Sequence, residues 1–96
     1  MSSALSISEI RNQINSLDEE LIIVLAKRMN AVKDVATYKK DNNLPVIQQD
    51  RIADLLSFWH KFAEKTNLDK EFITRLFYVV HDESVRKQIE QISQLN

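Results

Sequence analysis

The sequence contains no cysteine and no glycine, and its one proline is Pro45. The lack of cysteine excludes both a disulfide framework and a thiolate metal site. The lack of glycine excludes the glycine-rich phosphate loops of P-loop and Rossmann proteins. It also disfavours β-hairpins, because their tightest turns depend on glycine. We therefore expect an all-α chain.

Long apolar runs are missing as well. No stretch reaches the roughly 18 apolar residues that a membrane-spanning helix needs. The N-terminal residues lack a basic start followed by an apolar run, so no signal peptide is expected. The formal net charge of -1 gives no reason to expect nucleic acid or a membrane surface as a partner. The expected location is the cytoplasm.

What is present is typical of a small globular protein. Of the 96 residues, 44% are apolar, which is too high a share for a disordered chain. This length corresponds to one domain, which we expect to span residues 1–96. Because so short a chain has little interior of its own, association with a second copy is a natural way to gain a core.

A very long helix is expected from about residue 7 to residue 41. Ser6 and Glu9 have the spacing of a capping box at its start, and Pro45 follows its end. Apolar residues recur between them every three or four positions, at Ile10, Ile14, Leu17, Leu21, Leu25, Met29, Val32 and Val35. Such a helix is roughly 50 Å long, whereas a globule of this size has a radius of gyration of about 12 Å. The pattern therefore predicts an extended, intertwined helical homodimer.

Two shorter helices are expected to follow, giving three per chain. The second spans residues 49–65, with an inward face formed by Ile52, Leu55, Leu56, Trp59, Phe62 and Ala63. Residues 67–69 form a turn in which Asp69 is expected to cap the third helix. The third helix carries its apolar residues at Phe72, Ile73, Leu76, Phe77, Val80, Val85, Ile89 and Ile92.

Polar residues interrupt the helix faces in a pattern that indicates an anion site. Arg28 and Lys39 are 11 residues apart, so they share one stripe of the first helix, about 16 Å apart along its axis. Arg11 lies about 26 Å before Arg28, and it reaches the same anion only from the partner chain of an antiparallel dimer. Ser84 and Gln88 share a face of the third helix, where they can serve an uncharged oxygen of a ligand.

Each of these residues also has a plainer interpretation. A single arginine or lysine on a helix is usually a solvated charge, and a serine and a glutamine are usually surface or interhelical polar groups. His60 and His81 lack the spacing of helical metal ligands, so no metal site is expected. The carboxylates are scattered, with no pair typical of acid/base catalysis. Spacing alone thus supports a helical dimer with a possible anion site.

Short motifs follow one another in order along nearly the whole chain: Ile10-Arg11, Ile14, Leu17-Asp18, Leu21, Leu25-Ala26-Lys27-Arg28-Met29, Val35-Ala36-Thr37-Tyr38-Lys39, Leu44-Pro45-Val46, Asp50-Arg51, Asn67-Leu68-Asp69, Phe72-Ile73, Leu76-Phe77 and Asp82-Glu83-Ser84-Val85-Arg86-Lys87-Gln88. Their ordered combination resembles the helical, or type II, chorismate mutases. The resemblance implies rearrangement of chorismate to prephenate in aromatic amino-acid biosynthesis. It implies neither a metal nor another cofactor, because that reaction is pericyclic.

The resemblance also implies roles for four catalytic residues. Arg28, together with Arg11 of the partner chain, binds the two carboxylates of the substrate. Arginine suits this role because its planar guanidinium binds a carboxylate through two hydrogen bonds. Lys39 and Gln88 donate to the ether oxygen of the substrate.

Further residues are implied to complete the substrate-binding site. Ser84, Arg51 and the backbone near Gln48 complete the contacts to the carboxylates and the hydroxyl, and Val35 packs against the ring. Ile52 stands where mutases of this family usually have a glutamate that serves the ring hydroxyl, and Gln48 stands where they commonly have an aspartate. An amide both donates and accepts, so Gln48 is expected to compensate for Ile52.

Ile52 leaves related activities open. Isochorismate pyruvate-lyases, which form salicylate, tend to have an aliphatic residue there, and aminodeoxychorismate mutases have an altered pocket for the ring substituent. Ser84 and the spacing of the loop favour the chorismate mutase. A helical regulatory or interaction dimer, which keeps the fold without turnover, is the non-enzyme alternative that Ile52 also favours.

Overall fold

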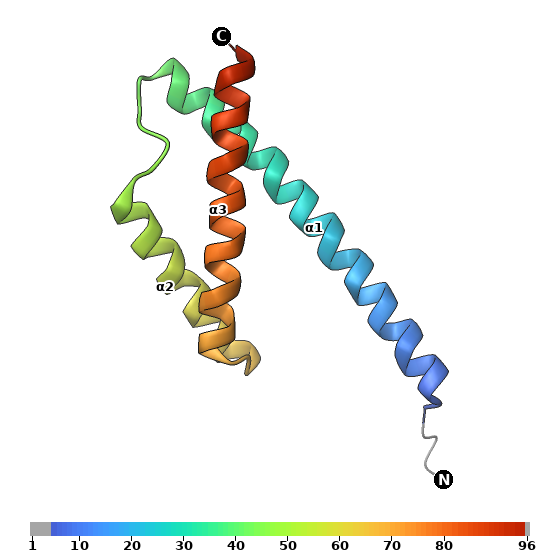
Figure 1. The fold of residues 1–96 in the computed structure, drawn as a ribbon. Helices are drawn as coiled ribbons and strands as arrows, with labels where there is room; N and C mark the ends of the chain where they lie inside the picture. Colours follow the sequence, from blue (N-terminus) through green and yellow to red (C-terminus); the bar gives the residue numbers. More distant parts are fainter. Residues whose placement is uncertain (1–4, 96) are drawn as a thin grey trace. The chain divides into compact units, whose positions relative to one another are not determined.

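The computed structural model describes residues 5–95, which form three α-helices (Figure 1). Helix α1 spans Ile7–Asp41, α2 spans Gln49–Thr66 and α3 spans Lys70–Leu95, and the described residues include no β-strand. The all-α fold with a very long first helix is therefore confirmed, and α2 ends one residue later than predicted. None of the helices in residues 5–95 is both long enough and apolar enough to span a membrane. The described residues divide into two compact units, residues 5–31 and 32–95.

The first unit contains the beginning of α1. The predicted capping box is present: the N–H of Glu9 donates to Oγ of Ser6 at 3.1 Å, and the N–H of Ser6 donates to a Glu9 carboxylate oxygen at 3.3 Å. These bonds satisfy donors that the start of a helix otherwise leaves unpaired. The apolar stripe that follows is surface in the monomer, since Leu17 is 62% exposed and Leu21 55% exposed. A single helical segment has no interior of its own, so this stripe stays exposed.

The second unit holds the end of α1 together with α2 and α3. Helix α1 ends at Asp41, as predicted, because the chain turns sharply after it. Asn43 adopts the left-handed conformation with φ 55°, and the N–H of Leu44 donates to the carbonyl of Lys39 at 2.8 Å. A left-handed residue is a common way to end a helix, and Pro45 cannot extend it.

Helices α2 and α3 are joined by a tight turn. Asn67 is left-handed with φ 60°, and the N–H of Leu68 donates to the carbonyl of Ala63 at 2.9 Å. A carboxylate oxygen of Asp69 accepts the N–H of Phe72 at 2.9 Å, which confirms the predicted cap of α3. The two helices converge toward this turn and separate toward the start of α2 (Figure 1).

The core of the second unit lies mainly between α2 and α3. Phe77 is only 1% exposed, and the ring of Trp59 meets it edge to face with a centroid distance of 5.3 Å. Aromatic pairs of this geometry add about 0.5–1.5 kcal/mol beyond the burial of their area. Nearer the turn, Nε2 of His60 and Oγ1 of Thr74 are 2.7 Å apart and join the same two helices. The other buried apolar residues are Ala36, Ala63, Ile73 and Val80.

The predicted inward position of Phe62 is wrong. Its side chain is 50% exposed, whereas the adjacent Ala63 is buried. The Phe62 ring lies against Phe58 at 5.0 Å between centroids, and the Lys65 ammonium lies 5.3 Å from its centre. Within the described residues α2 packs against α3, and one neighbouring helix covers only a narrow stripe. A residue at the edge of the apolar face therefore remains at the surface.

Candidate active site

Lys39 and Gln88 meet in the second unit. The Nζ of Lys39 donates to Oε1 of Gln88 at 2.9 Å and to the backbone carbonyl of Val46 at 2.6 Å. Lys39 lies in the last turn of α1, and the turn that follows returns the chain so that Val46 reaches it. The structure thus brings together the two residues that were expected to act on one substrate oxygen.

The contacts of Lys39 and Gln88 leave hydrogen-bond donors for a ligand. A lysine ammonium has three N–H groups, and the contacts to Gln88 and Val46 use two of them. Because Oε1 of Gln88 accepts from Lys39, its amide nitrogen remains the donor end of the side chain. A cation and a neutral amide are therefore held side by side, each with a donor to offer to an acceptor atom.

The Lys39 ammonium is electrostatically disfavoured where it lies. Burial lowers the pKa of Lys39, and the nearby positive charge of Arg51 lowers it further. Desolvation and a like charge both penalise the charged form. An anion bound beside Lys39 reverses this effect, because it stabilises both cations. The site is therefore suited to negative charge.

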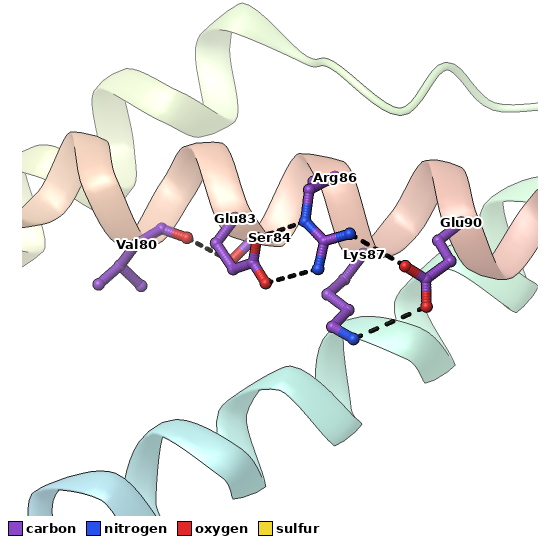
Figure 2. Close-up of polar contacts among 6 residues, drawn as sticks. All are labelled: Val80, Glu83, Ser84, Arg86, Lys87 and Glu90. Atoms are coloured by element: carbon purple, nitrogen blue, oxygen red, sulfur yellow. Dashed lines mark hydrogen bonds and ion pairs between the residues drawn. The ribbon is translucent and has the colours of Figure 1, made fainter.

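Ser84 and Gln88 are buried polar residues on α3, 4% and 7% exposed. Oγ of Ser84 donates to the backbone carbonyl of Val80 at 2.9 Å (Figure 2). A hydroxyl has one proton, so in this conformation the donor is used within the helix. A carboxylate only accepts, and Ser84 can therefore donate to one only after its hydroxyl turns away from Val80.

The start of α2 carries three of the predicted residues. The carbonyl of Gln48 accepts the N–H groups of Arg51 and Ile52 at 3.1 and 3.2 Å, while the Gln48 side chain makes no hydrogen bond to the start of α2. A recess of about 460 Å³ is lined by Gln48, Gln49, Asp50, Arg51 and Asp54. Ile52 is half-buried. The structure thus places Gln48 and Arg51 at one polar recess.

Three predicted residues lie elsewhere on α1. Val35, in the second unit, is 47% exposed, so its surface is open to a ligand. Arg11 and Arg28 belong to the first unit, where Arg11 is exposed and Arg28 is half-buried. Burial lowers the pKa of Arg28, yet a guanidinium stays protonated at neutral pH. The meeting of either arginine with Lys39 stays a prediction.

The charged cluster around Arg86 is separate from this site. Arg86 donates to the two carboxylate oxygens of Glu83 at 2.6 and 2.9 Å and to Glu90 at 3.0 Å (Figure 2). The hydrogen bonds between them raise the pKa of Arg86 and lower that of Glu83. Arg86 precedes Gln88 by two residues, about 200° around the helix. It therefore belongs to a surface network on the other side of α3.

The sequence profile of the family described as chorismate mutase type II matches residues 10–89. This range contains all the residues of the candidate site, from Arg11 to Gln88. The chain belongs to the type II chorismate mutase family. The order of short motifs along the sequence, which suggested this family, is therefore confirmed as a family signature.

Curated relatives carry the same family name in two contexts. The chain is 35% identical over 88 residues to a bifunctional chorismate mutase/prephenate dehydratase of Buchnera aphidicola subsp. Schizaphis graminum, and 34% identical over 88 residues to that of Escherichia coli K12. Each match covers 92% of this chain but 23% of the bifunctional protein. A chorismate mutase of Methanocaldococcus jannaschii is 25% identical over 84 residues, which is 85% of either chain. The chain thus spans about a quarter of the bifunctional relatives and most of the archaeal one.

One participant in the candidate site was missed by the sequence analysis. The backbone carbonyl of Val46 accepts a hydrogen bond from the Lys39 ammonium, in addition to the bond that Lys39 donates to Gln88. Every residue has a carbonyl, so no residue type could have signalled this contact. Its position depends on the turn at residues 42–45, which only the folded chain shows.

Two other features of the described residues do not extend the site. Within residues 5–95, no three His, Cys, Asp or Glu side chains are grouped so that they can hold a metal ion. A hollow of about 290 Å³ at the other end of α2 is lined by Phe58, Trp59, Phe62, Ala63, Thr66, Leu68 and Ile73. This hollow is almost wholly apolar, so it is unsuited to a dicarboxylate.

Proposed function

We propose that the chain is a chorismate mutase domain that rearranges chorismate to prephenate as a homodimer. The observation that carries the proposal is the Lys39–Gln88 pair, in which a half-buried cation and a buried amide hold each other and keep donors for a ligand. Membership in the type II chorismate mutase family supports it.

The reaction needs positioning and charge stabilisation rather than proton transfer. In chorismate the ether C–O bond breaks while a new C–C bond forms within the same molecule, so no nucleophile or general base takes part. Negative charge develops on the ether oxygen as its bond breaks. Lys39 and Gln88 each have a donor for that oxygen, and losing one such preorganised donor typically costs about 10²–10³ in rate.

The two carboxylates of chorismate provide the binding energy that holds its reactive conformer. We assign one carboxylate to Arg28 and the other to Arg11 of a partner chain, as the family resemblance implies. The lowered pKa of Lys39 beside Arg51 supports a site that is completed by an anionic ligand. Because the reacting atoms are already aligned when the substrate is bound, the entropy lost in aligning them is offset by binding and does not add to the activation barrier.

A second copy of the chain is the proposed cover for α1. Its stripe of Ile10, Ile14, Leu17 and Leu21 is exposed in the monomer. An apolar stripe of this kind on a long helix is typical of a subunit interface. A twofold dimer of antiparallel α1 helices would present Arg11 to the site of the partner, which gives two equivalent shared sites.

The test is conversion of chorismate by the purified chain. We expect the ultraviolet absorbance of chorismate to fall with time and prephenate to accumulate, without release of pyruvate. Lys39→Ala is expected to lose most of this activity, whereas Lys61→Ala, an exposed lysine on α2, should keep it. Absence of conversion by a dimeric, helical preparation would refute the proposed function.

An isochorismate pyruvate-lyase is the second candidate, and one observation favours it. Ile52 is apolar and half-buried in the first turn of α2, where it offers no partner to a ring hydroxyl. Elimination of pyruvate from isochorismate can use the same cage of cations. Pyruvate release from isochorismate that is faster than chorismate conversion would establish this candidate instead.

A further inference from the structure

The contacts between α2 and α3 set which residues lie at the same level along the two helices. They show an antiparallel order, since His60 contacts Thr74 and Trp59 contacts Phe77. Before the start of α2, Lys39 of α1 contacts both Val46 and Gln88. As residue numbers fall along α2, their partners rise along α3. Ile52 therefore lies level with the turn of α3 that contains His81 and Ser84.

His81 also lies on the same stripe of α3 as Gln88. The two are seven residues apart, and seven steps of about 100° return to within roughly 20° of the same direction. Ser84 lies between them on the same face. The stripe thus continues for two turns, about 10 Å, from the Lys39–Gln88 pair to His81.

The imidazole of His81 is held by packing and keeps its nitrogens for another partner. Its ring stacks on that of Phe77, with centroids 5.6 Å apart and planes 6° from parallel. Among residues 5–95, no hydrogen bond or ion pair engages the His81 nitrogens. The side chain is half-buried. A ring that is stacked on the core but has unused polar atoms is preorganised for a ligand.

We propose that His81 is a further substrate-binding residue, whose imidazole N–H donates a hydrogen bond to the ring carboxylate of the substrate. The inference rests on the proposed function, since it takes the ligand to be a chorismate-like dicarboxylate. With Gln88 and Lys39 at the ether oxygen, we orient the substrate so that its ring carboxylate, which is two ring carbons away from the ether-bearing carbon, points along the stripe toward His81. Ser84 is the nearer polar group there, but its proton is engaged by Val80. His81, one turn beyond Ser84, supplies the donor that a carboxylate requires.

The first test compares variants that separate the two properties of His81. His81→Phe keeps the aromatic stack on Phe77 and removes the N–H. His81→Asn and His81→Gln remove the ring but place an amide N–H near Nδ1 or Nε2, respectively. We expect His81→Phe to raise KM about ten-fold or more, because a hydrogen bond to a charged group is lost. Its kcat should change little, because the carboxylate is bound equally before and during the reaction.

The controls distinguish this role from a structural one. One of the two amide variants should keep KM within about three-fold of the wild type, although both lose the stack. His60→Phe, which removes the other histidine and its contact to Thr74, should leave KM unchanged. A chorismate analogue in which hydrogen replaces the ring carboxylate should bind wild type and His81→Phe equally. An unchanged KM in His81→Phe, or a penalty that persists with the analogue that lacks the carboxylate, would overturn the inference.

Calorimetric titration with chorismate separates this inference from the proposed function. A chain that binds chorismate without converting it, and binds about ten-fold more weakly as His81→Phe, would retain the role of His81 and refute the mutase activity. A chain that converts chorismate equally well with and without His81 would support the mutase activity and refute the role of His81. A chain that neither binds nor converts chorismate would refute both.

Discussion

The Lys39 ammonium and the Gln88 amide, 49 residues apart in the sequence, are joined by a hydrogen bond of 2.9 Å. This bond aligns two side chains from different helices and orients the glutamine with its oxygen toward the lysine. The amide nitrogen of Gln88 is thereby left as a donor, which is the end needed at an ether oxygen. The same pair also makes the site sensitive to any change in charge at position 88.

Replacement of Gln88 by glutamate should make the enzymatic activity depend on pH, with higher activity at lower pH. An ionised carboxylate still accepts from Lys39, but it cannot donate to the substrate and it repels the substrate carboxylates. Once protonated, the carboxylic acid regains a donor. We therefore expect Gln88→Glu to lose about 10²–10³ in kcat at neutral pH and to recover activity as pH falls. The measurement is kcat/KM from about pH 4.5 to about pH 8, a range that begins near the pKa of an ordinary glutamate. A flat profile over this range would contradict the role of Gln88.

The alkaline limit of activity should move when Arg51 is neutralised. Burial and then Arg51 lower the pKa of Lys39, and the proposed reaction needs Lys39 protonated. Activity should therefore fall as pH rises through a pKa below that of an ordinary lysine. Arg51→Gln removes the like charge, so the pKa rises and kcat should persist to higher pH. The measurement is kcat against pH, with the exposed Arg75→Gln as a charge-matched control that keeps the wild-type profile.

Activity should be restored by mixing two inactive variants. Arg11→Ala and Lys39→Ala each remove one contact from a site that is proposed to use Arg11 of the partner and Lys39 of its own chain. In a mixed dimer one site carries both lesions and the other carries neither. Random exchange of equal amounts should recover about a quarter of wild-type activity. No recovery after subunit exchange has been verified by mass spectrometry would show that Arg11 does not act in trans.

A charge placed on the apolar stripe of α1 should separate the subunits. Leu17 and Leu21 are both more than half exposed in the monomer, and we propose that they lie in the dimer interface. Leu17→Asp should give the mass of a monomer by sedimentation at micromolar concentration, with loss of activity. Glu19→Lys changes a charge on the opposite side of the same helix and should remain dimeric. A dimeric Leu17→Asp protein would place the interface elsewhere.

Ile52→Glu should improve the use of chorismate. An apolar side chain leaves the ring hydroxyl without a partner, and a buried unpaired hydroxyl costs about 1–3 kcal/mol. Adding a carboxylate is therefore expected to lower KM by roughly ten-fold. Gln48→Ala should raise KM, because the Gln48 amide is the proposed substitute partner. If Ile52→Glu abolishes chorismate conversion while the wild type releases pyruvate from isochorismate, the lyase assignment replaces the mutase.

The features that the sequence determined by itself are those that depend on near neighbours. The capping box of Ser6 and Glu9, the end of α1 at Asp41 and the cap at Asp69 were all predicted and are all present. Each of these signals is satisfied within about four residues of the chain. Helix boundaries could therefore be read locally, without knowing how the helices pack.

Only the tertiary structure decided which side chains meet and which face of each helix is covered. The two hydrogen bonds from Lys39, to Gln88 and to the carbonyl of Val46, depend on the direction of the chain after α1. The exposure of Phe62, in contrast to buried Ala63, depends on how α3 crosses α2. The lowered pKa of Lys39 depends on its burial and, to a smaller extent, on the proximity of Arg51. Helical periodicity predicts which residues share a face of a helix. Long-range packing decides what that face contacts, because burial and electrostatic interactions depend on distance in space rather than along the chain.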